Sequence, residues 1–310
     1  MPDASHTQPG RRLLLVHAHP DDETINNGAT MAKYVAERAA VTLVTCTLGE
    51  MGEVVVPDLE HLAHERQGGL GEHRIGELAA AMDELGVTDH RFLGGPGRFH
   101  DSGMAWGEDG GATVAPDVPE GAFWHADLKA AADELVPVIR ETRSQVLVTY
   151  DEYGGYGHPD HVQAHRVATY AVALSGTRSY RPDLGEPWTV SKVYWASMSE
   201  SRMRDALRTL RAAGDTTTFE GMDPDGPMMP FMIADELIDA AIDGSAFVDA
   251  KMAAMRAHRS QIALDHGFFA LPDSIGNQIW SQEHYRLAQG VRGPVDPATG
   301  CESDLFAGLD

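Results

Sequence analysis

The sequence predicts an α/β fold, with a Rossmann-like, mostly parallel sheet, helices on both faces, and a C-terminal part of mixed strands and helices. Short apolar runs of strand length alternate with longer amphipathic segments along the first half of the chain. Continuous apolar runs are typical of strands that are covered on both faces. Strands that alternate with helices form βαβ units, whose crossovers are right-handed.

The first half contains three expected strands and three expected helices. The strands are apolar-rich runs: residues 13–16, 41–47 and 145–150. The helices have apolar residues near helical spacing: residues 24–38, 61–85 and 124–143. Gly86 directly follows the second helical pattern and is a suitable C-cap.

The second half is expected to add a strand over residues 188–197 and helices over 199–213 and 246–260. Residues 235–243 could form either, and residues 214–230 are expected to form a loop. We therefore expect three parts: a disordered N-terminal tail, a Rossmann-like catalytic domain and a C-terminal α/β extension, over residues 1–10, 11–198 and 199–310. The extension is expected to pack on the domain and to help form its pocket.

The composition excludes several classes of function. The 310 residues include 24 basic and 47 acidic ones, so the formal net charge is −23 with neutral histidine. Neither nucleic acid nor an anionic membrane surface is an expected partner, because binding to both depends on lysine and arginine. Residues 1–10 contain no apolar segment, and two cysteines, Cys46 and Cys301, are too few for a disulfide framework. We therefore expect a cytoplasmic protein in a reducing compartment.

Glycine-rich segments separate the elements of the first half, at residues 94–97, 107–111 and 154–157. In an open α/β sheet, the loops that follow the strands gather at one edge, where ligands bind. A ligand site is therefore expected at that edge.

The first expected strand leads directly into His19-Pro20-Asp21-Asp22. Pro20 keeps His19 out of the α region, so the strand ends there. The following helix begins nearby, and its N-terminus tolerates neighbouring carboxylates because the helix dipole favours negative charge there. Taken alone, Asp21 or Asp22 could equally be a cap of that helix.

The third expected strand leads through a glycine loop into a second triplet of the same kind, His158-Pro159-Asp160, followed by His161. His19 and Asp22, together with one distant histidine, form a ligand set that suits Zn²⁺. Catalytic zinc sites have three protein ligands and one open position. The residues alone leave the third ligand open among His158, His161 and His165.

These motifs resemble the LmbE/PIG-L family of zinc-dependent N-acetylglucosamine deacetylases. The resemblance is carried by Ala18-His19-Pro20-Asp21-Asp22-Glu23 and His158-Pro159-Asp160-His161. It covers residues 11–170 and resumes at 187–190 and 304–309, whereas residues 199–245 match poorly. Four further segments are similar to the branch of the family that deacetylates N-acetylglucosaminyl-inositol in mycothiol biosynthesis: residues 44–50, 74–78, 101–104 and 154–158.

The resemblance implies one metal ion per chain, held by His19, Asp22 and His161. The ion would be Zn²⁺, with Fe²⁺ possible in vivo because such sites also accept iron. The resemblance also implies that Asp21 is the general base. Zinc polarises an amide carbonyl and makes water a stronger acid, so a carboxylate beside the ligands can take the proton as water attacks.

Three more residues have catalytic roles implied by the resemblance. Tyr156 corresponds to a mobile tyrosine that donates its phenolic hydrogen to the developing oxyanion. A role as a packing aromatic is the alternative for this side chain. His158 corresponds to a histidine that stabilises the transition state, and it is expected to be an imidazolium held by Asp160.

Arg74, Asp101 and Glu53 match residues that contact sugar or inositol hydroxyls in the family. Each of the three could equally be a surface charge or part of an ion pair. His165 lies one helical turn after His161 and could replace a ligand or support one. The other histidines that we considered are expected to be solvated: His61, His64, His73, His90, His125 and His258.

The implied function is hydrolysis of the acetamide of N-acetylglucosaminyl-inositol, a small-molecule substrate, to an amine and acetate. One alternative is an amidase that cleaves mycothiol S-conjugates. A non-catalytic alternative is a sugar-binding protein or a receiver-like module in which Asp21 and Asp22 hold Mg²⁺. That alternative leaves His19 and His161 without a role, because imidazole favours zinc or iron. No obligate protein partner is evident.

Overall fold

The computed structural model describes residues 10–107, 111–216, 218–229, 232–264 and 279–309. A large sheet has the strand order β3-β2-β1-β6-β7-β10-β9, and β8 pairs with β7. The strands are β1 (Arg12–His17), β2 (Ala40–Thr45), β3 (Asp89–Phe92), β6 (Val146–Thr149), β7 (Lys192–Ser199), β8 (Met232–Ile233), β9 (Ala240–Asp243) and β10 (Gln282–Gln289).

Most neighbours in this sheet are parallel. β1 runs parallel to both β2 and β6, and the series continues in parallel to β3 on one side and β7 on the other. β10 pairs in antiparallel with both of its neighbours, β7 and β9. The mostly parallel α/β sheet expected from the sequence is therefore confirmed.

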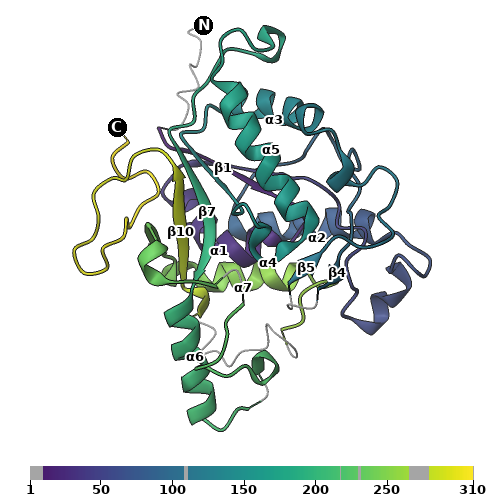
Figure 1. Ribbon diagram of the computed structural model, residues 1–310, viewed down its shortest axis with the longest axis vertical. Coiled ribbons are helices and arrows are strands. Elements are labelled where there is room, and N and C mark those ends of the chain that lie inside the picture. Colours follow the sequence, from purple (N-terminus) through teal and green to yellow (C-terminus); the bar gives the residue numbers. More distant parts are fainter. Residues whose placement is uncertain (1–9, 108–110, 217, 230–231, 265–278, 310) are drawn as a thin grey trace, which may run out of the picture.

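Helices cover both faces of the sheet (Figure 1). One face packs against α1 (Asp22–Ala36), α2 (Leu70–Leu85) and α7 (Val248–Ala257), and the other packs against α3 (Leu128–Thr142) and α5 (Pro159–Ser175). Side chains alternate along β1 because a strand has a period of two. Leu13 and Leu15 thus belong to the core of the first face, and Leu14 and Val16 to the core of the second.

Several helix boundaries differ from those expected. The helical pattern over residues 61–85 becomes a helix only at Leu70, after Gly68 and Gly69 adopt φ values of 77° and 101°. Pro57–Leu62 forms a separate 3₁₀ helix ahead of that break. Gly86 caps α2 in the left-handed conformation, as expected.

The strands β3 and β10 were not expected, because neither sequence is an apolar run. β3 is half-buried along its whole length at the edge of the sheet, and β10 has the sequence Gln-Glu-His-Tyr-Arg-Leu-Ala-Gln. The undecided segment 235–243 contains the strand β9. Residues 218–221, inside the expected loop, form a short 3₁₀ helix.

The C-terminal part continues the sheet of the first half. β9 and β10 extend it beyond β7, and α6 (Glu200–Ala212) projects away from it at the bottom of Figure 1. The proposed division at residue 198 stays a prediction, and the expected tail lies outside the described residues up to residue 9. In the part of the chain that the structure describes, no helix combines the length and apolar character needed to cross a membrane.

Candidate metal and catalytic site

A cleft of about 610 Å³ opens at the carboxyl ends of β1 and β6. Its walls come from the loops that follow these strands, from the short elements β4 (Ala105–Trp106) and α4 (Gly154–Gly157), and from residues 196–198 of β7. Met229 and Gln261, from the second half of the chain, also line it.

The structure brings His19, Asp22 and His161 together at the base of this cleft. Oδ2 of Asp22 lies 3.3 Å from Nδ1 of His19 and 3.3 Å from Nε2 of His161. All three side chains are buried. His19 comes from the turn between β1 and α1, Asp22 is the first residue of α1, and His161 comes from the first turn of α5. Residues that are far apart in the sequence therefore converge on one carboxylate oxygen.

The outer nitrogens of the two imidazoles are already engaged. Nδ1 of His161 lies 3.2 Å from the carbonyl oxygen of Gly154, and Nε2 of His19 lies 3.3 Å from a carboxylate oxygen of Asp160. An imidazole that donates a hydrogen bond through one nitrogen presents a lone pair on the other. The lone pairs of Nδ1 of His19 and Nε2 of His161 therefore face Oδ2 of Asp22.

This arrangement fits a divalent metal ion. Nε2 of His161 is buried and has no hydrogen-bond partner, although the Asp22 oxygen is close. Facing electron pairs of two imidazoles and a carboxylate are stabilised by a cation between them, and His and Asp are ligands of catalytic zinc. Histidine ligands typically donate their other N–H to a carboxylate or a carbonyl, as both do here.

The pKa shifts of His19 and Asp22 indicate that positive charge is favoured between these two side chains. Burial lowers the pKa of His19, but the carboxylates of Asp101, Asp160 and Asp22 outweigh it and raise the pKa well above its usual value. Burial raises the pKa of Asp22, but His161 and His19 outweigh it and hold the pKa well below its usual value.

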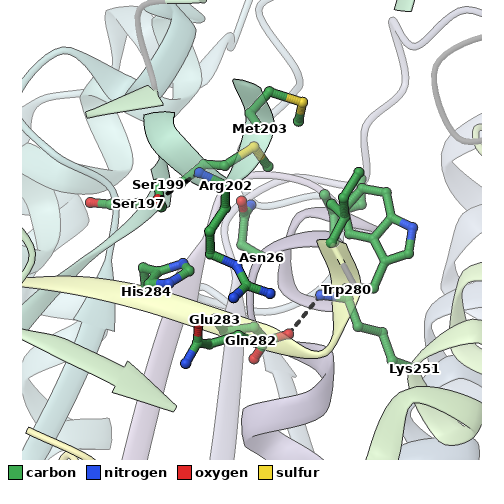
Figure 2. Close-up of a pocket in the computed structure, with 13 residues that line it drawn as sticks. Asn26, Ser197, Ser199, Arg202, Met203, Lys251, Trp280, Gln282, Glu283 and His284 are labelled. Carbon is green, nitrogen blue, oxygen red and sulfur yellow. Dashed lines mark hydrogen bonds and ion pairs between the residues drawn. The ribbon is translucent and has the colours of Figure 1, made fainter. Parts of the chain in front are cut away.

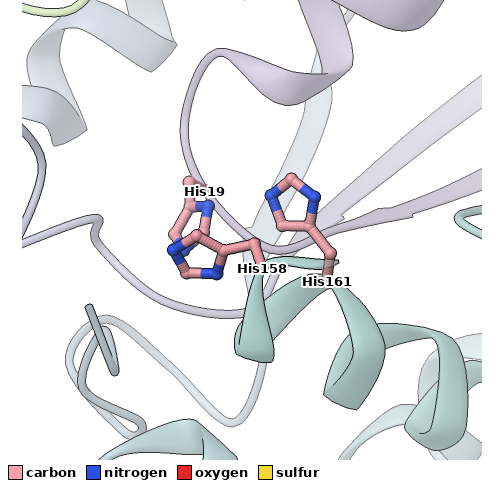
Figure 3. A group of neighbouring side chains, drawn as sticks. All are labelled: His19, His158 and His161. Atoms are coloured by element: carbon pink, nitrogen blue, oxygen red, sulfur yellow. The ribbon is translucent and has the colours of Figure 1, made fainter. Parts of the chain in front are cut away.

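His158 also belongs to this cluster, as Figure 3 shows. Candidate ligand atoms of His19, His158 and His161 all lie within 4.8 Å of one another. A second group of the same kind, on the outer side of His19, consists of His19, Asp101 and Asp160. His165 is in neither group, and its Nδ1 lies 3.0 Å from the carbonyl oxygen of Tyr150.

The structure corrects the expected pairing of His158 with Asp160. The Asp160 carboxylate accepts hydrogen bonds from the backbone N–H (2.8 Å) and the hydroxyl of Ser102, and it faces His19. His158 contacts Asp160 only through Nδ1, which accepts the backbone N–H of that residue at 3.1 Å. Burial and the neighbouring His19 and His161 lower the pKa of His158 well below its usual value, so it is a neutral imidazole.

Asp21 lines the cleft beside the ligand cluster. One of its carboxylate oxygens accepts a hydrogen bond from Arg74 at 2.9 Å. Burial raises the pKa of Asp21 to about 6, with a contribution from the Asp22 charge, although Arg74 acts in the opposite direction. A carboxylate with a pKa close to neutral can both accept and return a proton near neutral pH.

Of the three expected substrate-binding residues, Arg74 and Asp101 are occupied by the protein itself. Arg74 is buried and also donates to the carbonyl oxygens of Gly49, at 2.8 Å, and Pro20. Asp101 accepts the backbone N–H groups of Met51 and Gly103. Glu53 is exposed on the wall of the cleft. All three line the cleft, but a contact with substrate stays a prediction for each.

Tyr156 lies on α4, with its ring 5.1 Å from the His161 ring and 6.2 Å from the His158 ring. Burial and the Asp22 charge raise the pKa of Tyr156, so the phenol keeps its proton. The next residue, Gly157, has a φ of 100°, and a Cβ there would lie 2.4 Å from the carbonyl oxygen of Ala112. The loop that carries Tyr156 therefore requires glycine at this position.

Two residues of the site were not found from the sequence. Tyr150, at the end of β6, donates a hydrogen bond to Asp22 and stacks on His161. His258 was expected to be solvated, and that expectation is wrong, since its side chain is fully buried against Glu23. The position of Tyr150 at a strand end was a usable signal, whereas His258 has no neighbouring motif. His61, His64 and His125 are exposed, as expected, and His73 and His90 are half-buried.

Comparison with known proteins connects this geometry to a family. The family model described as "GlcNAc-PI de-N-acetylase" (PIG-L) matches residues 14–172. A relative from Nocardioides sp. (strain ATCC BAA-499 / JS614) is 65% identical over 299 residues, which are 96% of this chain and 99% of the relative. It is named 1D-myo-inositol 2-acetamido-2-deoxy-alpha-D-glucopyranoside deacetylase. A relative of the same name from Kribbella flavida is 64% identical, over 97% of this chain and 99% of its own length.

Solved structures share the fold at lower identity. The N,N'-diacetylchitobiose deacetylase from Pyrococcus horikoshii has a TM-score of 0.56 and 17% identity, and the match covers 93% of this chain and 88% of that one. At this identity the likeness concerns the fold. It extends over the C-terminal part of this chain as well as the region that the family model matches.

Proposed function

We propose that this chain, which belongs to the PIG-L family of GlcNAc-PI de-N-acetylases, hydrolyses the acetamide of N-acetylglucosaminyl-inositol. The products are glucosaminyl-inositol and acetate. This is a step of mycothiol biosynthesis. The relatives that carry this substrate in their name match this chain over nearly their whole length. The observation that carries the proposal is the convergence of two imidazole lone pairs on the Asp22 carboxylate at the base of the cleft.

The metal ion proposed for this site is Zn²⁺, one per chain, with Fe²⁺ as an alternative in vivo. His19, Asp22 and His161 would hold it, and the hydrogen bonds of the outer imidazole nitrogens would orient the two rings. When bound, the ion supplies Lewis acidity, which polarises the amide carbonyl and makes water a stronger acid.

Asp21 is proposed as the general base. Its carboxylate lines the cleft beside the ligands, and its raised pKa suits a group that takes a proton from the attacking water and then delivers one to the departing amine. The ion pair with Arg74 holds one carboxylate oxygen and leaves the other for the proton.

Tyr156 and His158 are proposed to stabilise the oxyanion that develops on the amide carbonyl. The phenol of Tyr156 keeps its proton and can donate it as a hydrogen bond. Nδ1 of His158 accepts a backbone N–H, so the proton of the neutral ring is on Nε2, which makes Nε2 a donor. Asp160 is proposed to act on His19, whose ring it orients, rather than on His158.

The cleft suits a substrate of the proposed size. Pockets for small ligands typically measure roughly 300–1,000 Å³, and this cleft of about 610 Å³ is within that range. Arg74, Asp101 and Glu53, which all line the cleft, are proposed to bind hydroxyl groups of the sugar or inositol, since carboxylates accept and guanidinium donates to such groups.

Acetate release from N-acetylglucosaminyl-inositol tests the proposal. We expect the metal-loaded chain to release acetate, the chelator-treated chain to stop, and Zn²⁺ or Fe²⁺ to restore the reaction. A strong preference for a mycothiol S-conjugate would replace the deacetylase by the amidase function. Binding of Mg²⁺ alone, without turnover of either compound, would replace both by a non-catalytic function.

A further inference from the structure

Glu23 and His258 form an ion pair that is completely enclosed by the protein. Nε2 of His258 lies 2.8 Å from Oε1 of Glu23, and both side chains are 0% exposed. Glu23 is in the first turn of α1, whereas His258 directly follows the last residue of α7, 235 positions later in the chain. The hydroxyl of Thr24 donates a further hydrogen bond to Oε1, at 2.6 Å. One carboxylate oxygen is thus held from two sides.

The other oxygen of Glu23 holds the backbone of Asp21. Oε2 accepts the N–H of Asp21 at 2.9 Å. Asp21 has a φ of 127° and a ψ of −36°, a conformation that residues other than glycine rarely adopt. Such conformations persist only where the surroundings fix them, and they concentrate at functional sites.

The other polar groups of Asp21 are fixed as well. Its carbonyl oxygen accepts the first two N–H groups of the α1 hydrogen-bond pattern, from Thr24 and Ile25, both at 3.0 Å. Its carboxylate accepts from Arg74 at 2.9 Å. Glu23 therefore supplies the contact at the backbone N–H, and His258 in turn fixes Glu23.

We propose that Glu23 and His258 are positioning residues for the general base: the pair holds the strained backbone of Asp21 and so aims its carboxylate into the cleft. This inference rests on the proposed deacetylase function and on the role given to Asp21 there. It makes the end of α7, which lies outside the region matched by the family model, part of the support of the reaction centre.

A purely structural role, the attachment of α7 to α1, is the explanation to be separated from this one. A second buried pair makes the same kind of attachment. Nζ of Lys251, on α7, lies 2.6 Å from Oε1 of Glu283, and the Glu283 carboxylate accepts the backbone N–H groups of Ala29 and Thr30 on α1. Figure 2 shows this pair, which does not include Asp21. Glu283→Gln is therefore a matched control for Glu23→Gln.

The test compares kcat and KM for acetate release from N-acetylglucosaminyl-inositol, together with bound metal and Tm, in the full-length metal-loaded protein. We expect Glu23→Gln to lower kcat by about tenfold or more, because small misplacements of a reacting group cost up to about a hundredfold. Its KM and metal content should stay within about twofold of those of the unsubstituted protein. Glu283→Gln should lower Tm by a similar amount and leave kcat within about twofold.

A double-mutant cycle with Asp21→Asn identifies the residue through which Glu23 acts. In the Asp21→Asn background, Glu23→Gln should change kcat by less than about twofold, since residues that act as a unit are non-additive.

An undiminished kcat in Glu23→Gln, an equal loss in Glu283→Gln, or the full loss in the Asp21→Asn background would each overturn the inference. If Glu23→Gln does not fold, His258→Asn decides, with a smaller loss of kcat in the same direction. Failure of the unsubstituted protein to release acetate would instead contradict the proposed function.

Discussion

The phenolic oxygen of Tyr150 lies 2.7 Å from Oδ2 of Asp22, the same oxygen that faces His19 and His161. The Tyr150 ring stacks on the His161 ring, with centroids 4.2 Å apart and an interplanar angle of 17°. The backbone N–H of Ala18 donates to the phenolic oxygen at 2.8 Å, so the hydroxyl hydrogen is directed to Asp22. Tyr150, directly after β6, thus orients two of the three proposed ligands.

Removal of this hydroxyl should weaken metal binding. Tyr150→Phe keeps the ring that stacks on His161 but removes one of the hydrogen bonds that orient Asp22. Loss of a group that orients a ligand typically costs about 10–100-fold in metal affinity. Competition with a chelator of known affinity for Zn²⁺ measures the change. Activity should recover when excess metal is supplied. An unchanged metal affinity in the folded variant would contradict this role for Tyr150.

Asp21→Asn should separate proton transfer from metal binding. The amide has nearly the shape of the carboxylate but cannot accept the proton, and general-base catalysis contributes about 10²–10⁴-fold to rate. We expect kcat for acetate release to fall by about that factor while metal content stays at one ion per chain. Normal turnover by this variant would show that another group is the base.

Tyr156→Phe should lower kcat more than it changes KM. The phenol is expected to donate its hydrogen bond only to the oxyanion, and loss of one such donor costs about 10²–10³ in kcat. Steady-state kinetics on N-acetylglucosaminyl-inositol measures both constants. If KM rises while kcat is retained, Tyr156 binds the substrate in the ground state instead.

The sequence was sufficient for the central strands β1, β2, β6 and β7 and for the motifs that follow β1 and β6, but not for β3 and β10. The strand ends predicted that His19 and Asp22 would meet one of the histidines after the third apolar run, because parallel strands end at one edge. The choice of His161 among those histidines came from the family resemblance. The strand end indicated that Tyr150 lies at this edge of the sheet. It did not indicate that Tyr150 contacts Asp22, because that contact joins residues 128 positions apart.

The two wrong expectations, for His258 and for the partner of Asp160, also concern contacts between distant parts of the chain. His258 follows a helix in a segment with no motif, and only the packing of α7 against α1 buries it beside Glu23. The pairing of Asp160 with Ser102 and His19 depends on the loop at residues 101–103, whose path no local pattern indicates. Local patterns thus placed side chains at the correct edge but did not identify their partners.

A buried ion pair fixes the C-terminal segment to the sheet. Nζ of Lys192 lies 2.6 Å from Glu302, and their side chains are 1% and 0% exposed. Lys192→Met would leave the Glu302 carboxylate buried without its cation, which typically costs about 3–5 kcal/mol. Urea-induced unfolding should show this loss, and Lys192→Met combined with Glu302→Gln should recover part of it. If the double variant is no more stable than Lys192→Met, the unpaired charge is not the cause.

Stability should also fall on mild acidification, in part because of His284. Burial, with a contribution from Arg202, lowers the pKa of His284 to about 4 from its ordinary value of 6.5. The unfolded chain therefore takes up the proton first. This group destabilises the fold as pH drops below 6.5, and its effect is complete near pH 4. Between pH 7 and 5 the cost amounts to about 2 kcal/mol.

His284→Gln should remove that part of the pH dependence, because glutamine does not titrate. The free energy of unfolding, measured in urea at pH 7 and at pH 5, should fall by about 2 kcal/mol less in the variant than in the unsubstituted protein. The comparison within each protein cancels any constant effect of the substitution on packing. An equal fall in both proteins would mean that His284 is protonated in the folded state at pH 5, with Asp235, the acidic neighbour that acts on its pKa, compensating for the positive charge of Arg202.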